Sequence, residues 1–162
     1  GLAAFEGLPG RYALAGRIGN VEFIEDSIAT RPLSVAAALA ATPGPIAWIA
    51  GGHSKGADVR ELEGLIREKV ALFVGMGESG GALHEIVSEW VPAVLCPHTD
   101  GGAALRCAVH SAFNHLQAHH PLGGTVLLAP LAASFDQFGD YRERAQRFRD
   151  AVKEEELSWT LS

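Results

Sequence analysis

The sequence predicts an α/β fold, with a Rossmann-like, mostly parallel sheet and helices on both faces. Short apolar segments alternate with longer segments whose apolar residues recur at helical spacing. The short segments are almost continuously hydrophobic, which is typical of parallel strands buried on both faces. A chain of 162 residues, 48% of them hydrophobic, has room for one ordinary domain around such a sheet.

The expected strands follow each other at residues 21–25, 45–51, 70–75, 92–96 and 125–130. Each is short and is bounded by glycine, proline or polar residues, and PAVLC at 92–96 is the weakest of the five. The clearest helices have apolar residues three or four positions apart. These residues are Leu105, Ala108, Val109, Ala112 and Leu116 in one helix, and Tyr141, Ala145, Phe148 and Val152 in another.

Four loops follow the expected strands, and ligands of such sheets bind outside the carboxyl ends of strands. The loops are DSIATRP (26–32), GGHSKGAD (51–58), GMGESGG (75–81) and LAASFDQF (131–138). Lys55 offers a flexible point charge, while Thr30 and Ser134 offer short hydroxyls, a combination suited to binding carboxylates. Asp26, Ser27 and Asp58 are also good candidates for capping the helices that follow them.

Composition excludes several classes of protein. Thirteen Lys and Arg against nineteen Asp and Glu give a formal charge of -6, which argues against a general binder of nucleic acids or membrane surfaces. No apolar run approaches the roughly 20 residues of a membrane span, and the first residues do not resemble a signal peptide. Cys96 and Cys107 form no CxxC pair and no disulfide framework, so we expect small core residues in a reducing, cytoplasmic protein.

GHSKG (52–56) fits the G-x-S-x-G nucleophile elbow of the α/β hydrolases. Those enzymes have several strands before the elbow and a glycine-rich oxyanion loop. Only about one strand precedes this motif, and no glycine-rich oxyanion loop follows an earlier strand, so the hydrolase interpretation is disfavoured.

GMGESG (75–80) fits the dinucleotide fingerprint GxGxxG, with Asp100 about twenty residues later. The fingerprint normally follows the first strand of its unit, and Asp100 falls past the next strand rather than at its tip. Glycines that permit a tight turn and close helix packing are the simpler interpretation. A Rossmann-like nucleotide-binding module remains the alternative interpretation of the chain.

His115 and His119 lie on one helix face at i and i+4, the spacing of some zinc sites. A zinc helix of the HExxH type also needs a glutamate between them, and the intervening residues are Leu116, Gln117 and Ala118. Solvated helix-end histidines are the default for these two residues and for His120, so we expect no metal site.

Three blocks resemble the carboxy-terminal domain of the Mur ligases, in the same order and at about the same spacing. They are GLPGRYALAGRIGNVEFIEDSIAT, AGGHSKGAD and APLAASFDQFGDYRERAQRF. The resemblance covers nearly the whole chain and is closest to the glutamate-adding members of the family. It implies that residues 1–11 are a hinge from a missing central domain and that residues 12–162 are the amino-acid-binding domain.

The resemblance also implies a reaction of peptidoglycan synthesis, and hence of cell wall formation, cell shape and cell division. ATP, with Mg²⁺, phosphorylates the carboxylate of UDP-N-acetylmuramoyl-L-alanine, and the amine of glutamate attacks the acyl phosphate. The residues implied for ATP are Arg11 and Asp26. Those implied for glutamate are Thr30 and Lys55 at its α-carboxylate, and Ser134 and the backbone near Tyr141 at its side-chain carboxylate.

Two departures from the family pattern leave the handedness of the glutamate open. Ile28 stands where the family usually has lysine, and Arg31, which partly restores the charge, stands where it has asparagine. DSIATRP is more similar to a variant branch that adds L-glutamate.

The chain also lacks the phosphate loop G-x-x-x-x-G-K-[ST], since Gly56 is followed by alanine. We therefore expect no catalytic residue in it, the magnesium ligands and the UDP-sugar site in preceding domains, and no turnover by the isolated chain.

Overall fold

The computed structural model describes residues 10–53, 58–134 and 137–162 of the chain, and these residues contain one six-stranded sheet. The strands are β1 (Ala13–Ile18), β2 (Val21–Glu25), β3 (Ile46–Ala50), β4 (Val70–Met76), β5 (Ala93–Cys96) and β6 (Gly124–Leu128). Their spatial order is β1-β2-β6-β3-β4-β5, and all neighbours are parallel except β1 and β2. The five expected strands and the mostly parallel sheet are confirmed.

β1 was not expected from the sequence. It pairs antiparallel with β2, and the register shifts between Leu14 and Gly16. Gly19, at the turn between the two strands, has a φ of 58°, a conformation that glycine adopts without strain. Gly16 and Arg17 interrupt the apolar pattern of ALAGRI, so period-two alternation is too weak to identify the strand.

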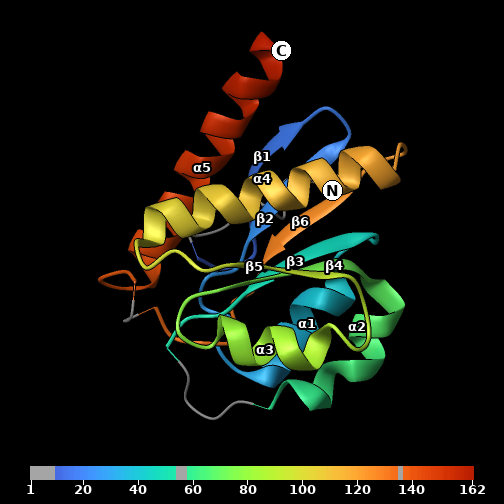
Figure 1. Ribbon diagram of the computed structural model, residues 1–162, viewed down its shortest axis with the longest axis vertical. Coiled ribbons are helices and arrows are strands. Elements are labelled where there is room, and N and C mark those ends of the chain that lie inside the picture. The colour runs from blue at the N-terminus through green and yellow to red at the C-terminus, as the bar shows by residue number, and fades with distance from the viewer. Residues whose placement is uncertain (1–9, 54–57, 135–136) are drawn as a thin grey trace.

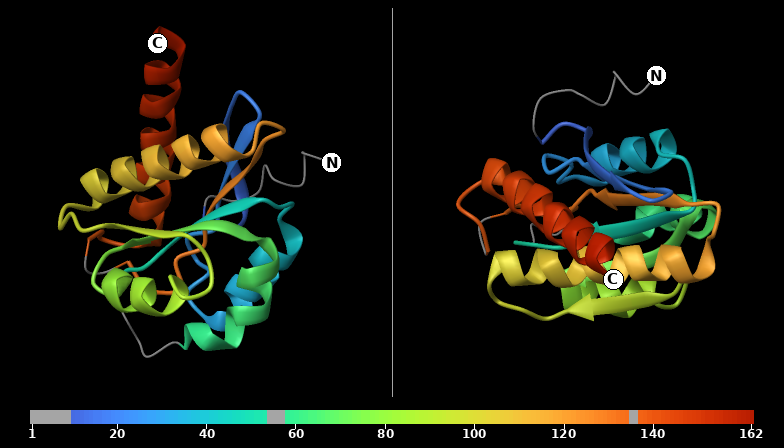
Figure 2. Two further views of the ribbon diagram at one scale, coloured as in Figure 1. Left: turned by 45° about the vertical axis from the view of Figure 1, so that its right-hand side comes forward. Right: turned by 90° about the horizontal axis from the view of Figure 1, so that it is seen from above.

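Helices cover both faces of the sheet, as predicted (Figure 1). One face packs against α1 (Pro32–Ala41), the 3₁₀ helix η2 (Val59–Leu62), α2 (Glu63–Lys69) and α3 (Gly80–Val87). The other face packs against α4 (Gly101–His119) and α5 (Tyr141–Leu161), whose carboxyl end extends beyond the body of the domain (Figure 2). Within the described ranges, none of the helices has the length and hydropathy needed to cross a bilayer.

β3 shows why the strands of this sheet are continuously apolar in sequence. All five of its residues are buried, and they alternate between the two hydrophobic clusters on either side of the sheet. Trp48, fully buried, donates from its indole nitrogen to the carbonyl of Ala129 at 2.7 Å and packs edge-on against Phe73. These contacts tie β3 to β4 and to the residue that follows β6.

Short polar side chains begin several of the helices. Asp58, Asp100 and Asp140 each accept a hydrogen bond from a backbone N–H in the first turn of η2, α4 and α5, respectively. Such caps satisfy N–H groups that have no partner inside the helix. The expected cap at Asp58 is confirmed, whereas Asp26 and Ser27 have other partners, described below.

The structure corrects the prediction for the two cysteines. Cys96, at the end of β5, and Cys107, on α4, form a disulfide with a Cα–Cα distance of 6.0 Å. Cys96 is a buried core residue, as expected, and Cys107 is partly buried against the same cluster. Their spacing of 11 residues in the sequence did not reveal that a strand end and a helix turn would bring them together.

Candidate functional site

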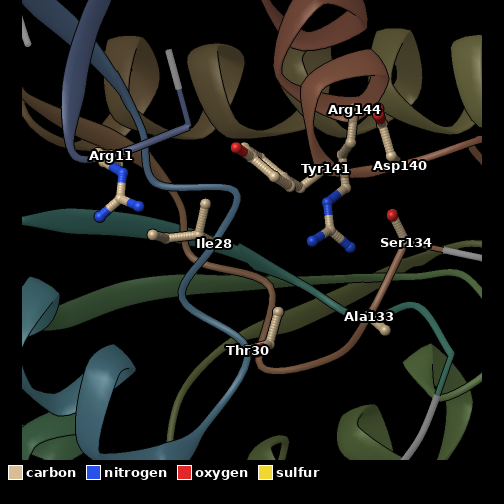
Figure 3. Close-up of a pocket in the computed structure, with 8 residues that line it drawn as sticks. All are labelled: Arg11, Ile28, Thr30, Ala133, Ser134, Asp140, Tyr141 and Arg144. Atoms are coloured by element: carbon tan, nitrogen blue, oxygen red, sulfur yellow. The ribbon is translucent and has the colours of Figure 1, made fainter. Parts of the chain in front are cut away.

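A pocket of about 320 Å³ lies beyond the carboxyl ends of β2 and β6 (Figure 3). It combines two cations, one carboxylate, three hydroxyl-bearing side chains and a small apolar wall. The residues that line it are Arg11, Ile28, Thr30, Ala133, Ser134, Asp140, Tyr141 and Arg144.

Four separate segments of the chain build this pocket. Arg11 precedes β1, Ile28 and Thr30 follow β2, Ala133 and Ser134 follow β6, and three residues belong to the start of α5. Because β2 and β6 are parallel neighbours, their carboxyl ends meet at one edge of the sheet. The family resemblance implied an ATP contact for Arg11 and glutamate contacts for Thr30, Ser134 and the backbone near Tyr141, and the structure brings these four residues together in one pocket.

Arg144 is the principal pocket residue that the sequence analysis missed. Its side chain is buried, and Figure 3 shows it extending from α5 toward the segment that carries Ser134. The guanidinium donates to the Ser27 hydroxyl at 2.8 Å, to the Ser27 carbonyl at 2.6 Å and to the Ala132 carbonyl at 3.0 Å. Arg144 therefore fixes the loop after β2 and the loop after β6 relative to each other.

A signal for Arg144 was present in the sequence. It lies four residues before Phe148 and seven before Ala151, both buried, and thus on the apolar face of α5. An arginine on the buried face of a helix needs several hydrogen-bond acceptors, which marks it as a structural or binding residue.

The pocket is suited to an anion. Arg11 and Arg144 contribute two positive charges against the single carboxylate of Asp140, which caps α5 by accepting from the Glu143 N–H at 2.9 Å. Tyr141 is the first residue of this 21-residue helix, where N–H groups have no carbonyl partner within the helix and the helix dipole favours negative charge. Short hydroxyls at Thr30 and Ser134 add uncharged donors.

Two residues beside the pocket have left-handed backbone conformations that non-glycine residues rarely adopt. Tyr12 has a φ of 48° and Leu131 a φ of 57°. The Leu131 N–H donates to the Ala29 carbonyl at 2.9 Å, and the Tyr12 hydroxyl is 2.8 Å from that of Thr42. Such strain persists only where surrounding contacts enforce it, and it gathers at binding sites.

Gly10 shows how closely the chain before β1 approaches α5. A Cβ atom at Gly10 would lie 2.8 Å from the Tyr141 ring, and its φ is 87°. The Gly10 N–H donates to the carboxylate of Glu25, a fully buried side chain that is also 3.3 Å from the guanidinium of Arg149. Arg11 is thus held at the rim of the pocket by its neighbour.

Asp26 lies beside the pocket and does not line it. Its carboxylate accepts from the Tyr12 N–H at 3.2 Å, and its own N–H donates to the Leu128 carbonyl at 2.8 Å. The pKa of Asp26 is raised to about 6, mainly by burial and also by the neighbouring Glu25, while the Tyr12 N–H and Arg11 act in the opposite direction. The two residues assigned to ATP are therefore close enough to interact electrostatically.

The remaining expectations for the loops have mixed outcomes. Lys55 lies outside the described residues, as does most of the GHSKG motif; His53, two residues before Lys55, forms an antiparallel bridge with Ala133 of the pocket. Arg31 is exposed, is the N-cap residue of α1 and does not line the pocket. The positive charge of the pocket comes from Arg11 and Arg144 instead. Ile28 contributes an apolar wall where the family usually has lysine.

The GMGESG turn after β4 has a packing explanation. A Cβ atom at Gly75 would lie 2.8 Å from the Gly80 carbonyl oxygen, so the two glycines allow α3 to approach β4. Ser79 exchanges hydrogen bonds with Gly52, whose N–H donates to the Ser79 hydroxyl at 3.1 Å. Asp100, the carboxylate that a dinucleotide site would require, caps α4 by accepting from the Ala103 N–H.

The histidines at the end of α4 lie close together, at the end of the sheet where β3 and β4 begin. The rings of His115 and His119 are 4.6 Å apart, and burial lowers the pKa of His115, with further lowering by His119 and His120. Among the residues that the structure describes, no three or more His, Cys, Asp or Glu side chains are arranged to hold a metal ion.

The fold and the pocket define an α/β domain with a pocket suited to an anion at the carboxyl ends of its parallel strands. No model of a known protein family matches the chain. It is 48% identical over 145 residues, 89% of its length, to the UDP-N-acetylmuramoylalanine–D-glutamate ligase of Thermus thermophilus. It is 39% identical over 152 residues, 94% of its length, to the protein of the same name from Deinococcus radiodurans. In both cases it covers 33% of the relative.

A solved structure also matches. The crystal structure of the UDP-N-acetylmuramate-alanine ligase MurC from Thermotoga maritima aligns over 94% of this chain and 32% of its own, with a TM-score of 0.53 and 16% sequence identity, which supports the fold. The predicted resemblance to the Mur ligases is confirmed: this chain is homologous, over nearly its whole length, to about a third of the UDP-N-acetylmuramoylalanine–D-glutamate ligases.

Proposed function

We propose that this chain is the carboxy-terminal, glutamate-binding domain of an ATP-dependent ligase that joins glutamate to UDP-N-acetylmuramoyl-L-alanine in peptidoglycan synthesis. The observation that carries the proposal is the convergence of Arg11, Thr30, Ser134 and Tyr141 on one pocket. These residues come from distant parts of the sequence, and the family resemblance implies a contact with ATP for Arg11 and with glutamate for the other three. The names of the relatives favour D-glutamate. The proposal also includes a cytoplasmic location and a role in cell shape and division, as the family resemblance implies.

Glutamate offers two carboxylates, and the pocket and its surroundings offer complementary groups for both. Ser134, the N-terminal N–H groups of α5 and the pinned guanidinium of Arg144 form the end that receives the side-chain carboxylate. Thr30 and Lys55 bind the α-carboxylate. The substrate amine then points out of the pocket, toward the acyl phosphate that it attacks.

Arg11 and Asp26 form the side of the domain that meets ATP. Arg11 lines the rim of the pocket, and Asp26 lies just outside it, so both can contact a nucleotide that approaches from another part of the protein. The described residues offer no cluster of metal ligands, and the sequence has no phosphate loop. Mg²⁺, the ATP phosphates and the UDP-sugar are therefore assigned to the rest of the ligase, which supplies the phosphorylation chemistry.

This domain contributes by holding glutamate and placing its amine. Bringing three substrates together in one orientation is itself a large rate effect, and it needs the complete protein. We expect no ligation by the isolated chain.

The test is steady-state kinetics of the full-length ligase, measured as phosphate release with ATP, Mg²⁺ and UDP-N-acetylmuramoyl-L-alanine. Release with D-glutamate alone supports the proposal in full, and release with L-glutamate alone assigns the chain to the variant branch. Ser134→Ala removes one hydroxyl donor and should raise the KM for glutamate about tenfold, with the KM for ATP little changed.

Ser88→Ala is the matched control, because Ser88 is an exposed residue at the end of α3 whose hydroxyl donates to the Glu85 carbonyl of its own helix. Its kinetics should equal those of the wild type. An unchanged KM for glutamate in Ser134→Ala would reject the assigned pocket, and no release with either enantiomer would reject the ligase function.

A further inference from the structure

The disulfide lies beside the loop that carries Ser134. Cys96 ends β5, and Cys107 lies in the second turn of α4, so the bond closes a loop that contains residues 97–101 and the start of that helix. These are the two cysteines of the 162-residue sequence. The proposed function assigns no role to them.

The closed loop supports the turn at Ser134 through two contacts. The Gln137 side-chain amide donates to the His98 carbonyl at 2.9 Å. A Cβ atom at Gly101 would lie 2.5 Å from the Phe138 ring and 2.7 Å from the Gln137 carbonyl oxygen, so the first turn of α4 packs directly on this segment. The Ser134 carbonyl in turn accepts from the N–H groups of Gln137 and Phe138 at 3.1 and 2.9 Å.

The strand that ends at Cys96 lies at the edge of the sheet. β5 is a four-residue edge strand that pairs only with β4, and Val94 and Leu95 are 37% and 41% exposed. Edge strands of this kind make few contacts and open at low free energy. The covalent link to the long helix α4 compensates for this, because it fixes Cys96 and therefore the start of the segment that contains His98.

We propose that Cys96 and Cys107 are a reversible redox modification site that tunes glutamate binding, an inference that rests on the proposed function for its effect on catalysis. A dithiol, either a protein or a small molecule, attacks the partly buried Cys107 sulfur; the Cys96–Cys107 bond breaks as two thiols form. The dithiol loses two electrons and two protons and becomes a disulfide. The oxidised form holds the Ser134 turn in its binding conformation, and the reduced form binds glutamate more weakly.

The experiment compares the full-length ligase before and after reduction with dithiothreitol under native conditions, with the thiols counted by alkylation and mass spectrometry. Because part of the reduced population must order its Ser134 turn on binding, the KM for glutamate should rise between about twofold and tenfold, with kcat changed less than about twofold. Hydrogen exchange of residues 134–141 should become faster on reduction, a readout that does not depend on catalysis.

Cys107→Ser is the main variant, because Cys107 is the less buried partner and serine leaves Cys96 in its core position. Its KM should equal that of the reduced wild type and should not respond to dithiothreitol. Cys96→Ala repeats the test with the other partner, and thermal unfolding of each variant establishes that it is folded.

The results separate this inference from the proposed function. A disulfide that dithiothreitol does not reduce in the folded ligase, an unchanged KM and exchange rate after reduction, or a Cys107→Ser variant that still responds to reductant would each overturn it. A ligase that is inactive in both redox states would reject the proposed function, and faster exchange at residues 134–141 on reduction would still support the redox site.

Discussion

Two regions at the carboxyl edge of the sheet differ in what their sequence patterns mean. The pocket beyond β2 and β6 has no compact motif, yet side chains from four segments converge there. The GMGESG turn after β4 fits a well-known motif, yet its glycines serve the packing of α3 on β4. The comparison teaches that chemistry follows from side chains brought together by the fold, and that glycine spacing alone reports on backbone approach.

Arg144→Met should break the first region and produce the largest effect. It leaves the Ser27 hydroxyl and the carbonyls of Ser27 and Ala132 without their donor. We expect a loss of about 3 kcal/mol in the free energy of unfolding and a fall of about 100-fold in kcat/KM for glutamate. Urea unfolding and steady-state kinetics of the full-length ligase measure both.

Arg144→Lys is the matched control for charge. It keeps the cation but cannot reach three acceptors in the geometry of a guanidinium, so both losses should be intermediate. If Arg144→Met bound glutamate normally, the two loops would not depend on this residue.

Gly75→Ala should disrupt the packing at the GMGESG turn. Its effect should be smaller and confined to the free energy of unfolding. The added Cβ would lie 2.8 Å from the backbone oxygen of Gly80, so α3 must shift, at about 2 kcal/mol of unfolding free energy. Gly81→Ala is the control, since no atom lies within 4 Å of its Cβ position. Its stability should equal or slightly exceed that of the wild type.

In the full-length ligase, both glycine variants should keep a KM for glutamate within about twofold of the wild type, because neither residue lines the pocket. Saturable NAD binding that Gly75→Ala abolishes would contradict this comparison and favour the nucleotide-binding module.

Asp26→Asn tests a residue just outside the pocket. It should change the free energy of unfolding in a pH-dependent way, and this effect should be the smallest of the three. Because burial raises the pKa of Asp26 from 3.8 to about 6, the native state binds this proton more tightly than the unfolded state does. The carboxyl group therefore destabilises the fold progressively as the pH rises from about 4 to about 6, and the full penalty applies above that range.

The asparagine variant is free of this penalty and can still accept from the Tyr12 N–H. Because Asp26 is partly solvent-exposed, we expect the variant to gain about 1 kcal/mol over the wild type at pH 7.5 and almost nothing at pH 3.5. Urea unfolding of this chain at the two pH values measures the difference. An equal gain at both would mean that ionisation of Asp26 is not the cause.

The sequence predicted the buried strands, and it nominated Thr30 and Ser134 as polar loop residues, because both leave local signals. Arg11 and Tyr141 were named only through the family resemblance. Continuous apolar runs identify β2, β3, β4 and β6, and the loops after them must share one edge of a parallel sheet. Thr30 and Ser134 are hydroxyl residues in those loops, so their convergence follows from the topology.

Features that depend on distant contacts were not predictable in the same way. β1 is an edge strand with a register shift and an interrupted pattern, so it is visible only through its pairing with β2. The disulfide requires the end of β5 and the second turn of α4 to be adjacent. Arg144 stands among other arginines in the sequence, and its burial depends on Ser27, 117 positions earlier.

That separation has a consequence for the order of events during synthesis. In the sheet, β6 lies between β2 and β3, so β2 joins β3 and β4 in one sheet only after β6 has been made. β6 comes late in the chain, and Arg144 follows it. The hydrogen bonds from Arg144 that link the two loops of the pocket therefore cannot form until α5 has been translated and has docked. A nascent or carboxy-terminally shortened polypeptide would have both loops that precede α5 and would still lack Asp140, Tyr141 and Arg144, three of the residues that line the pocket.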